Sequence, residues 1–383
     1  MSRKVAIAGL IALAVLGGSL AITLTGGSVP SEDPAPDASE RQVASGNFDP
    51  RRMIDLLPPD SIPAIDDPRF VSIEDADFLS PNEPVVSLEL NEEARAYPLQ
   101  ILTWHEIVND VVAGQPVAVT YCPLCNSAVV FERVHKSTVL DFGTSGKLYD
   151  SALVMYDRQT DSLWLHFEGR AVQGELAGAR LAVVPAQILS FEQFRQDHTD
   201  GLVLSKDTGF SKPYGTNPYD FYDTNESPFL FRGNIDDRLN PIERVVGIEQ
   251  SKQVVAFPYS ILSDGFRAEA GVVQDRVGGR EVAVFWRAGV ASALDSPEIA
   301  LGRDVGSSGV FVPEANGRRL NFRVRDGEIV DRETSSVWSL GGLAVSGPLE
   351  GEQLEPVAHI NAFWFAWQAY HPDTHISRAD PAR

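Results

Sequence analysis

The chain of 383 residues contains two cysteines, Cys122 and Cys125, in the stretch YCPLCN. A Cys-x-x-Cys turn brings two sulfur atoms within reach of each other. As thiolates, the pair can hold a soft or borderline metal ion. As a dithiol it can exchange electrons with another disulfide, and as a disulfide it can stiffen the turn. The spacing therefore predicts a metal site, a redox couple or a brace.

A transition-metal site, with copper or zinc, is the leading prediction. Two cysteines alone do not complete such a site, so histidine ligands are needed. His105, in TWHEIVND, is the first candidate, and His166, in SLWLHFEG, is the second. We expect Cys122, Cys125 and His105 to bind the ion, either to handle it or to catalyse a reaction at an open coordination position.

A predicted hairpin is the reason to place His105 near the cysteines. Residues 107–112 and 117–121 are rich in β-branched side chains and flank Ala113-Gly114, a typical turn. An antiparallel pairing there brings the segment before residue 107 towards Cys122. We expect Glu106 or Asp110 to orient the imidazole or to act as a base, and Glu106 joins the two cysteines as a candidate catalytic residue.

Two further stretches supply candidates for the lining of a pocket. These are Trp104 and Asp110 in TWHEIVND, and Gly143 and Ser145 in FGTSGKL. The second stretch lacks the spacing of a phosphate-binding loop and of a hydrolase nucleophile elbow. The glycines instead favour a tight hairpin turn through residues 143–146.

Two alternatives to the metal site stay open. In the first, the protein is a thiol-disulfide oxidoreductase in which Cys122 is the attacking thiolate and Cys125 the resolving thiol. In the second, it is a non-catalytic interaction protein of the cell envelope with a structural disulfide. An oxidising compartment favours the disulfide, although so short a loop gains little chain entropy from closure.

The N-terminus predicts export. A basic start is followed by an uncharged apolar run over residues 5–24, which fits a signal peptide or a membrane anchor within residues 1–28. Residues 29–50 are rich in proline and acidic side chains and read as a disordered linker. We expect a location in the periplasm or on the outer face of the cytoplasmic membrane, attached through the N-terminal segment if it is uncleaved.

The charge of the chain excludes one class of partner. With 53 acidic and 32 basic side chains, the net charge is −21. Such a surface repels phosphate backbones, so nucleic-acid binding is not expected. The expected partners are a metal ion or a thiol-bearing protein.

Internal duplication is the clearest pattern in the sequence. Blocks of the first half recur in the same order 160 to 174 residues later: AYP at 96 as AFP at 256, GQPVAVTY at 114 as GREVAVFW at 279, and YDRQTDSLW at 156 as VDRETSSVW at 330. A period of this length indicates duplicated domains. Short strand-like runs followed by one amphipathic helix predict two α+β units, mainly antiparallel and related by a pseudo-twofold axis.

The predicted units are residues 51–210, which carry the Cys-x-x-Cys site, and residues 245–383, joined by a connecting segment at 211–244. The second unit has RAGVASA where the first has CPLCNSA. Residues common to both units serve the shared fold, and Asp157-Arg158 is an example because it recurs as Asp331-Arg332. The cysteines are confined to the first unit and are freer to serve function.

The same blocks resemble the DUF3179 family of exported bacterial proteins. The resemblance rests on DSIPAIDDPRF, AYPLQILTWHEIVND, VTYCPLCNSAVVFER, FGTSGKLYDSALVMYDRQTDSLW and the terminal HPDT. It covers about residues 50 to 375 and implies one coherent family chain, without an activity. At His166 the resemblance leads us to expect an uncharged polar residue such as glutamine.

Overall fold

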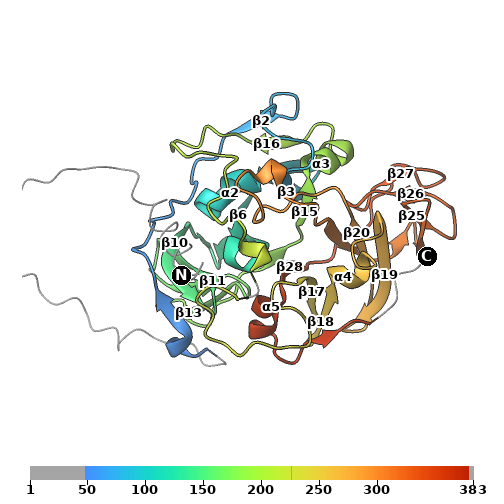
Figure 1. Cartoon of the computed structure of the whole chain (residues 1–383). Coiled ribbons are helices and arrows are strands. Elements are labelled where there is room, and N and C mark those ends of the chain that lie inside the picture. The colour runs from blue at the N-terminus through green and yellow to red at the C-terminus, as the bar shows by residue number, and fades with distance from the viewer. Residues whose placement is uncertain (1–47, 226, 379–383) are drawn as a thin grey trace, which may run out of the picture.

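The computed structural model describes residues 48–225 and 227–378. The predicted signal or anchor segment and residues 29–47 of the predicted linker lie outside the described residues. Figure 1 shows the first unit, coloured blue to green, beside the second unit, coloured yellow to red. No helix in the described ranges is long and apolar enough to cross a membrane.

Strands make up most of the first unit. Its larger sheets have the strand orders β1-β10-β11-β12-β13, β14-β7-β6-β5 and β15-β3-β4-β16-β2. The strands are β1 (Met53–Asp55), β2 (Phe70–Ser72), β3 (Pro84–Leu90), β4 (Glu93–Pro98), β5 (Ile107–Val112), β6 (Gln115–Cys122), β7 (Ser127–Glu132), β8 (Val134–His135), β9 (Thr138–Val139), β10 (Phe142–Tyr149), β11 (Ala152–Asp157), β12 (Leu163–Leu165), β13 (Arg170–Gln173), β14 (Val183–Val184), β15 (Gln187–Ser190) and β16 (Leu202–Leu204).

The second unit has sheets of the orders β28-β17-β18-β29, β19-β20-β21 and β24-β25-β26-β27. Its strands are β17 (Arg244–Gln250), β18 (Gln253–Pro258), β19 (Ala270–Val277), β20 (Arg280–Arg287), β21 (Ser307–Phe311), β22 (Glu314–Ala315), β23 (Arg318–Arg319), β24 (Phe322–Arg325), β25 (Glu328–Asp331), β26 (Val337–Trp338), β27 (Ala344–Ser346), β28 (Ile360–Phe363) and β29 (His375–Ile376).

The helices are short. They are α2 (Leu99–His105), α3 (Phe191–Asp197), α4 (Tyr259–Leu262) and α5 (Trp364–Tyr370), with the 3-10 turns η2 (Pro50–Arg52), η3 (Pro123–Cys125), η4 (Tyr222–Thr224) and η5 (Ile299–Leu301). Within the described residues, paired strands are antiparallel except for β16 with β4 and β18 with β29. The prediction of a strand-rich, mainly antiparallel α+β protein is thus confirmed.

The two units use the same order of strand pairing. In the first, β3 pairs with β4 and β15, and β4 pairs in parallel with β16. In the second, β17 pairs with β18 and β28, and β18 pairs in parallel with β29. The amphipathic helices predicted in both halves are α3 and α5. The relation of the units by a pseudo-twofold axis stays a prediction.

The aspartate that recurs in the repeated sequence blocks has the same structural task in both units. Asp157 is fully buried, accepts the indole N–H of Trp164 at 2.8 Å and caps the backbone N–H of Thr160 at 2.7 Å. Asp331 accepts the indole N–H of Trp338 at 3.1 Å in the same manner. This agrees with a role in the shared fold.

One predicted turn is wrong. Residues 143–146 do not form a hairpin turn but belong to β10, and the chain reverses at Asp150-Ser151, both with positive φ. The glycines serve close packing instead. A Cβ at Gly146 would overlap the carbonyl oxygen of Leu57, and the register of β10 with β11 shifts at this point.

The apolar core joins the two units. The largest cluster of buried apolar side chains contains Tyr97 and Trp164 of the first unit together with Trp364 and Trp367 of the second. Burial of large aromatic side chains is the main stabilising term in such a core. The units therefore pack against each other through apolar surface.

Candidate functional site at the Cys122–Cys125 disulfide

The two cysteines form a disulfide at the tip of a strand hairpin. Strand β6 ends at Cys122, the turn η3 follows, and Ser127 opens β7 directly opposite Cys122. The Cα atoms of the two cysteines are 5.6 Å apart, within the usual range for a disulfide. Cys122 is 2% exposed and Cys125 is 0% exposed. The pair is thus an oxidised and buried bridge.

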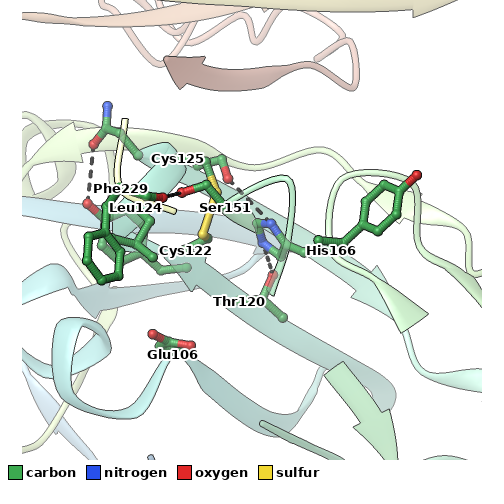
Figure 2. The surroundings of a disulfide bond; sticks show 12 residues. Glu106, Thr120, Cys122, Leu124, Cys125, Ser151, His166 and Phe229 are labelled. Atoms are coloured by element: carbon green, nitrogen blue, oxygen red, sulfur yellow. Dashed lines mark hydrogen bonds between the residues drawn. A yellow bond between two sulfur atoms is a disulfide. The ribbon is translucent and has the colours of Figure 1, made fainter. Parts of the chain in front are cut away.

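The connecting segment, residues 211–244, covers this bridge. The hydroxyl of Tyr222 donates to the carbonyl oxygen of Leu124 at 3.0 Å, between the two cysteines. Ser151 donates to the carbonyl oxygen of Phe229, which holds the same segment against the turn after β10. Figure 2 shows Leu124, Phe229 and Ser151 around the disulfide. The connecting segment therefore closes the side of the turn that would otherwise face solvent.

His105 does not contact the cysteines. The predicted hairpin of β5 and β6 around Ala113-Gly114 is present, but His105 precedes it, at the end of α2. Its Nδ1 donates to the carbonyl oxygen of Pro63 at 2.7 Å, and its Nε2 accepts from the hydroxyl of Tyr214 at 2.6 Å. Burial lowers the pKa of His105 to about 4. Both ring nitrogens are occupied, and the imidazole is neutral.

His166 lies closer to the disulfide. Its Nε2 donates to Thr120 Oγ1 at 2.9 Å, and its Nδ1 faces Ser127 Oγ at 3.4 Å, the residue paired with Cys122. Figure 2 shows the imidazole beside the disulfide with both bonds dashed. Burial lowers the pKa of His166 to about 3. This side chain is a neutral packing residue with both nitrogens in hydrogen bonds.

The prediction of a copper or zinc site is therefore wrong. Cysteine must be a thiolate to bind a metal, and Cys122 and Cys125 are bonded to each other. His105 and His166 already use their nitrogens in protein hydrogen bonds. Across residues 48–225 and 227–378, no three histidine, cysteine, aspartate or glutamate side chains are grouped to hold a metal ion.

Glu106 is the unusual group of the site. It follows α2 with φ 59°, in the left-handed region, which costs a non-glycine residue about 1–2 kcal/mol. Its carboxyl group is buried, and Oε1 faces the hydroxyl of Tyr219 at 3.4 Å. Burial raises the pKa of Glu106 to about 8, so it is protonated at neutral pH. Its backbone carbonyl accepts from Tyr121, next to Cys122.

The prediction that Glu106 or Asp110 orients the imidazole of His105 is wrong. Glu106 bonds to Tyr219, as above. Asp110 accepts from Arg95 and from the hydroxyl of Tyr97, both at 2.6 Å. Its carboxylate thus ties β5 to β4, where opposite charge and a phenol satisfy it, and it orients no histidine.

A small pocket opens beside Glu106. It has a cavity volume of about 40 Å³. Its lining comes from the segment 56–62, from Leu124 of the disulfide turn, from Thr144 and residues 146–148 of β10, and from Tyr219. Its walls are mainly apolar, and Glu106, Lys147 and Tyr219 are among the residues that bring polar groups to it.

The residues predicted to line a pocket lie elsewhere. Trp104 donates to the carbonyl oxygen of Thr216 at 3.2 Å, and Ser145 donates to that of Val154 at 2.5 Å. Gly143 packs against Tyr156. From β10, Thr144 and residues 146–148 line the pocket, and Gly143 and Ser145 do not.

Three tyrosines of the connecting segment were missed by sequence reasoning. Tyr214 bonds to His105, Tyr219 to Glu106 and Tyr222 to Leu124. Each bond spans about a hundred residues of chain, so no local pattern indicates it. The available signal was the aromatic run YGTNPYDFY in a segment otherwise assigned to a linker, since buried tyrosines need hydrogen-bond partners.

Comparison with known proteins identifies the family of the chain. A family model described as "Protein of unknown function (DUF3179)" matches residues 59–374. Searches of curated proteins and of solved structures found no match. Because the matched region includes the disulfide hairpin, the connecting segment and both units, the chain belongs to the DUF3179 family.

Proposed function

We propose that this is an exported, non-catalytic interaction protein of the cell envelope, in which the Cys122–Cys125 disulfide braces the loop between β6 and β7. The observation that carries the proposal is the burial of both sulfur atoms under the connecting segment. A sulfur atom that exchanges with a partner protein has to be reached by the partner's thiolate. Export is supported by the disulfide itself, because such bonds persist in oxidising compartments.

The electrostatics of the site support the same role. His166 and Glu106 flank the pair, and both are uncharged at pH 7 because burial shifts their pKa values. Reactive thiolates are stabilised by nearby positive charge, and apolar burial raises the pKa of a thiol. If the bridge were reduced, these two neighbours would give Cys122 no compensating charge, and its thiol would react slowly.

Thiol exchange in native protein tests the proposal. The oxidised protein is incubated in glutathione buffer, and free thiols are counted with and without urea. We expect the bridge to resist reduction until the protein unfolds, and we expect no turnover of a disulfide substrate. Rapid native reduction with turnover would overturn the proposal.

A double variant, Cys122→Ser with Cys125→Ser, separates bracing from chemistry. Opening a loop this short costs less than opening a longer one, and the chain-entropy account puts the cost at about 2 kcal/mol. We expect a folded protein whose unfolding free energy falls by about that amount. An unchanged unfolding free energy would argue against the brace.

A thiol-disulfide oxidoreductase is the second candidate, and Glu106 is the observation in its favour. A partner thiolate would attack Cys122 Sγ and form a mixed disulfide while the bond to Cys125 breaks. The departing Cys125 thiolate would need a proton, and the candidate donor is Glu106, whose carboxyl group burial keeps protonated at neutral pH. In the exchange experiment, this candidate requires turnover that falls in Glu106→Gln, whereas the brace requires none.

We also infer that the two units arose by duplication and are related by a pseudo-twofold axis. The repeated sequence blocks and the matching order of strand pairing support this. Reciprocal contacts support it as well, because β15 packs on β21 of the other unit while β28 packs on β7. In an experimental structure, residues 84–204 should superpose on residues 244–376 by a rotation near a half turn, and any other rotation would contradict the axis.

A further inference from the structure

A second pocket, which shares no lining residue with the one beside Glu106, lies between the two units. It is open to solvent on one side and has a cavity volume of about 50 Å³. The first unit contributes Ser87, Glu89, Gln187 and His198, and the second unit contributes Gly341 and His359. Clefts between packed units are frequent sites for small ligands.

Strand register places the polar groups of the first unit together. Gln187 of β15 lies directly opposite Ser87 of β3, and Glu89 follows Ser87 by two residues. Side chains at these positions share one face of the sheet. His198, after α3, extends the group, since its Nδ1 lies 3.9 Å from Glu89 Oε2.

Two hydrogen-bond acceptors in this lining are unsatisfied. Gln187 Oε1 and His359 Nε2 are buried without a hydrogen-bond partner among the described residues. His359 is 8% exposed, and its Nδ1 lies 2.9 Å from the carbonyl oxygen of Val357. A carbonyl only accepts, so Nδ1 carries the proton and Nε2 presents a lone pair. Buried acceptors of this kind are costly unless a donor meets them.

The charges of the residues that line this pocket favour a ligand whose hydrogen-bond donors carry positive charge. Among the described residues that form the pocket, Glu89 is the one carboxylate, and none is lysine or arginine. Burial lowers the pKa of His198 and of His359 below 6.5, so neither brings positive charge at neutral pH. The net charge of −21 adds a field that draws cations.

We propose that this pocket binds a small primary ammonium ion, with Glu89, Gln187 Oε1 and His359 Nε2 as acceptors for its N–H groups. An alkylammonium has three N–H donors and one positive charge, which matches three acceptors of which one is anionic. A quaternary ammonium has the charge without the donors, and a diol has donors without the charge. These two compounds therefore separate recognition of an ammonium group from attraction of any cation or any polar molecule.

Calorimetric titration of the intact protein with ethanolamine tests the proposal, with choline and ethylene glycol as controls. We expect saturable binding of ethanolamine alone. Equal binding of choline, or no binding of ethanolamine, would overturn the proposal.

Matched variants locate the site. Glu89→Gln and Gln187→Met should each weaken ethanolamine binding, by about tenfold or more for the charged partner. Glu249→Gln is the matched control, because Glu249 occupies on β17 the place that Glu89 occupies on β3 and is likewise exposed. Binding that is insensitive to both pocket variants, or that falls equally in the control, would refute the site.

Discussion

At the scale of single residues, burial sets the ionisation of the groups beside the disulfide, and Glu106 gives a prediction. Its pKa is raised from the ordinary 4.5 to about 8, so between these values the folded state holds a proton that the unfolded state has released. The unfolding free energy should therefore fall as pH rises through this window, by at most about 1.4 kcal/mol per pH unit. Glu106→Gln should remove this fall, as measured by urea unfolding at pH 5 and pH 8.

A surface carboxylate supplies the control for Glu106. Glu92 is exposed, and Glu92→Gln should leave the pH dependence of the wild type in place. Parallel pH profiles for wild type and Glu106→Gln would mean that the carboxyl group is not held neutral by its surroundings.

His166 has the opposite effect on the pH dependence of the unfolding free energy. Its pKa is lowered from 6.5 to about 3, so between these values the unfolded state binds a proton that the folded state refuses. The unfolding free energy should fall as pH decreases through the window. His166→Gln keeps a polar side chain for Thr120 and should make the protein more resistant to acid. Thermal unfolding at pH 7 and pH 4 checks this, with exposed His375→Gln as the control.

The residue scale is also where sequence reasoning failed most. The spacing identified the cysteines and Glu106 as members of one region, and they are. The sequence pattern also placed His105 beside the cysteines, because His105 directly precedes the hairpin of residues 107–121 and a hairpin can be predicted from local sequence. His105 instead bonds to Pro63 and Tyr214, which lie 42 and 109 residues away in the sequence. Such contacts depend on the tertiary fold.

At the scale of elements, strands with alternating or β-branched residues were predictable, and close-packed elements were not. The pattern found β5 and β6 and an amphipathic helix in each half. It missed α2, which is buried on almost every face and so lacks a polar stripe. It also took the glycines of β10 for a turn, although they permit the chain segment of residues 56–62 to approach β10.

This close approach predicts a large effect for Gly146→Ala. The backbone N–H groups of Leu56 and Leu57 both donate to the carbonyl oxygen of Gly146 at 3.0 Å. Gly146 has φ 72°, so alanine brings backbone strain of about 1–2 kcal/mol. Its Cβ would also overlap Leu57, which adds about 1–3 kcal/mol of overpacking. Urea unfolding should show that the unfolding free energy of Gly146→Ala is lower than that of the wild type by the sum of these two terms.

Gly114→Ala isolates the backbone term of that sum. Gly114 has φ 81° in the β5–β6 turn, and an added Cβ there would meet no described atom within 4 Å. Gly114→Ala should therefore lower the unfolding free energy by the backbone strain alone. Equal losses in the two variants would show that residues 56–62 are free to move away from β10.

At the scale of the whole molecule, the sequence predicted two related units but not how they are joined. The two units could be recognised because blocks of sequence recur at similar offsets. The core that they share depends on packing between their surfaces, and no single block of sequence shows which surfaces meet. Trp364 and Trp367 of the amphipathic helix α5 belong to a cluster that spans both units. The boundaries at residues 210 and 245 stay a prediction, although the shared core argues that the units do not unfold separately.

Asp223 in η4 anchors the connecting segment to the second unit. Its carboxylate accepts from Arg244 at 2.7 Å, from Ser292 at 2.5 Å and from Arg303 at 2.8 Å. Burial alone would raise the pKa of Asp223, but Arg244 and the hydrogen bonds outweigh it and hold the pKa below 3.8. The stability that this charge contributes is therefore present at neutral pH and lost in acid.

Asp223→Asn should thus destabilise the whole molecule at once. Removing one charge of a buried ion pair leaves Arg244 uncompensated, which costs about 3–5 kcal/mol. Scanning calorimetry at pH 7 should show one transition for wild type and one, at lower temperature, for the variant, because a shared core couples the units. Asp295→Asn removes a more exposed partner of Arg303 and should cost less than about 1 kcal/mol. Two separate transitions in the wild type would mean that each unit folds on its own core.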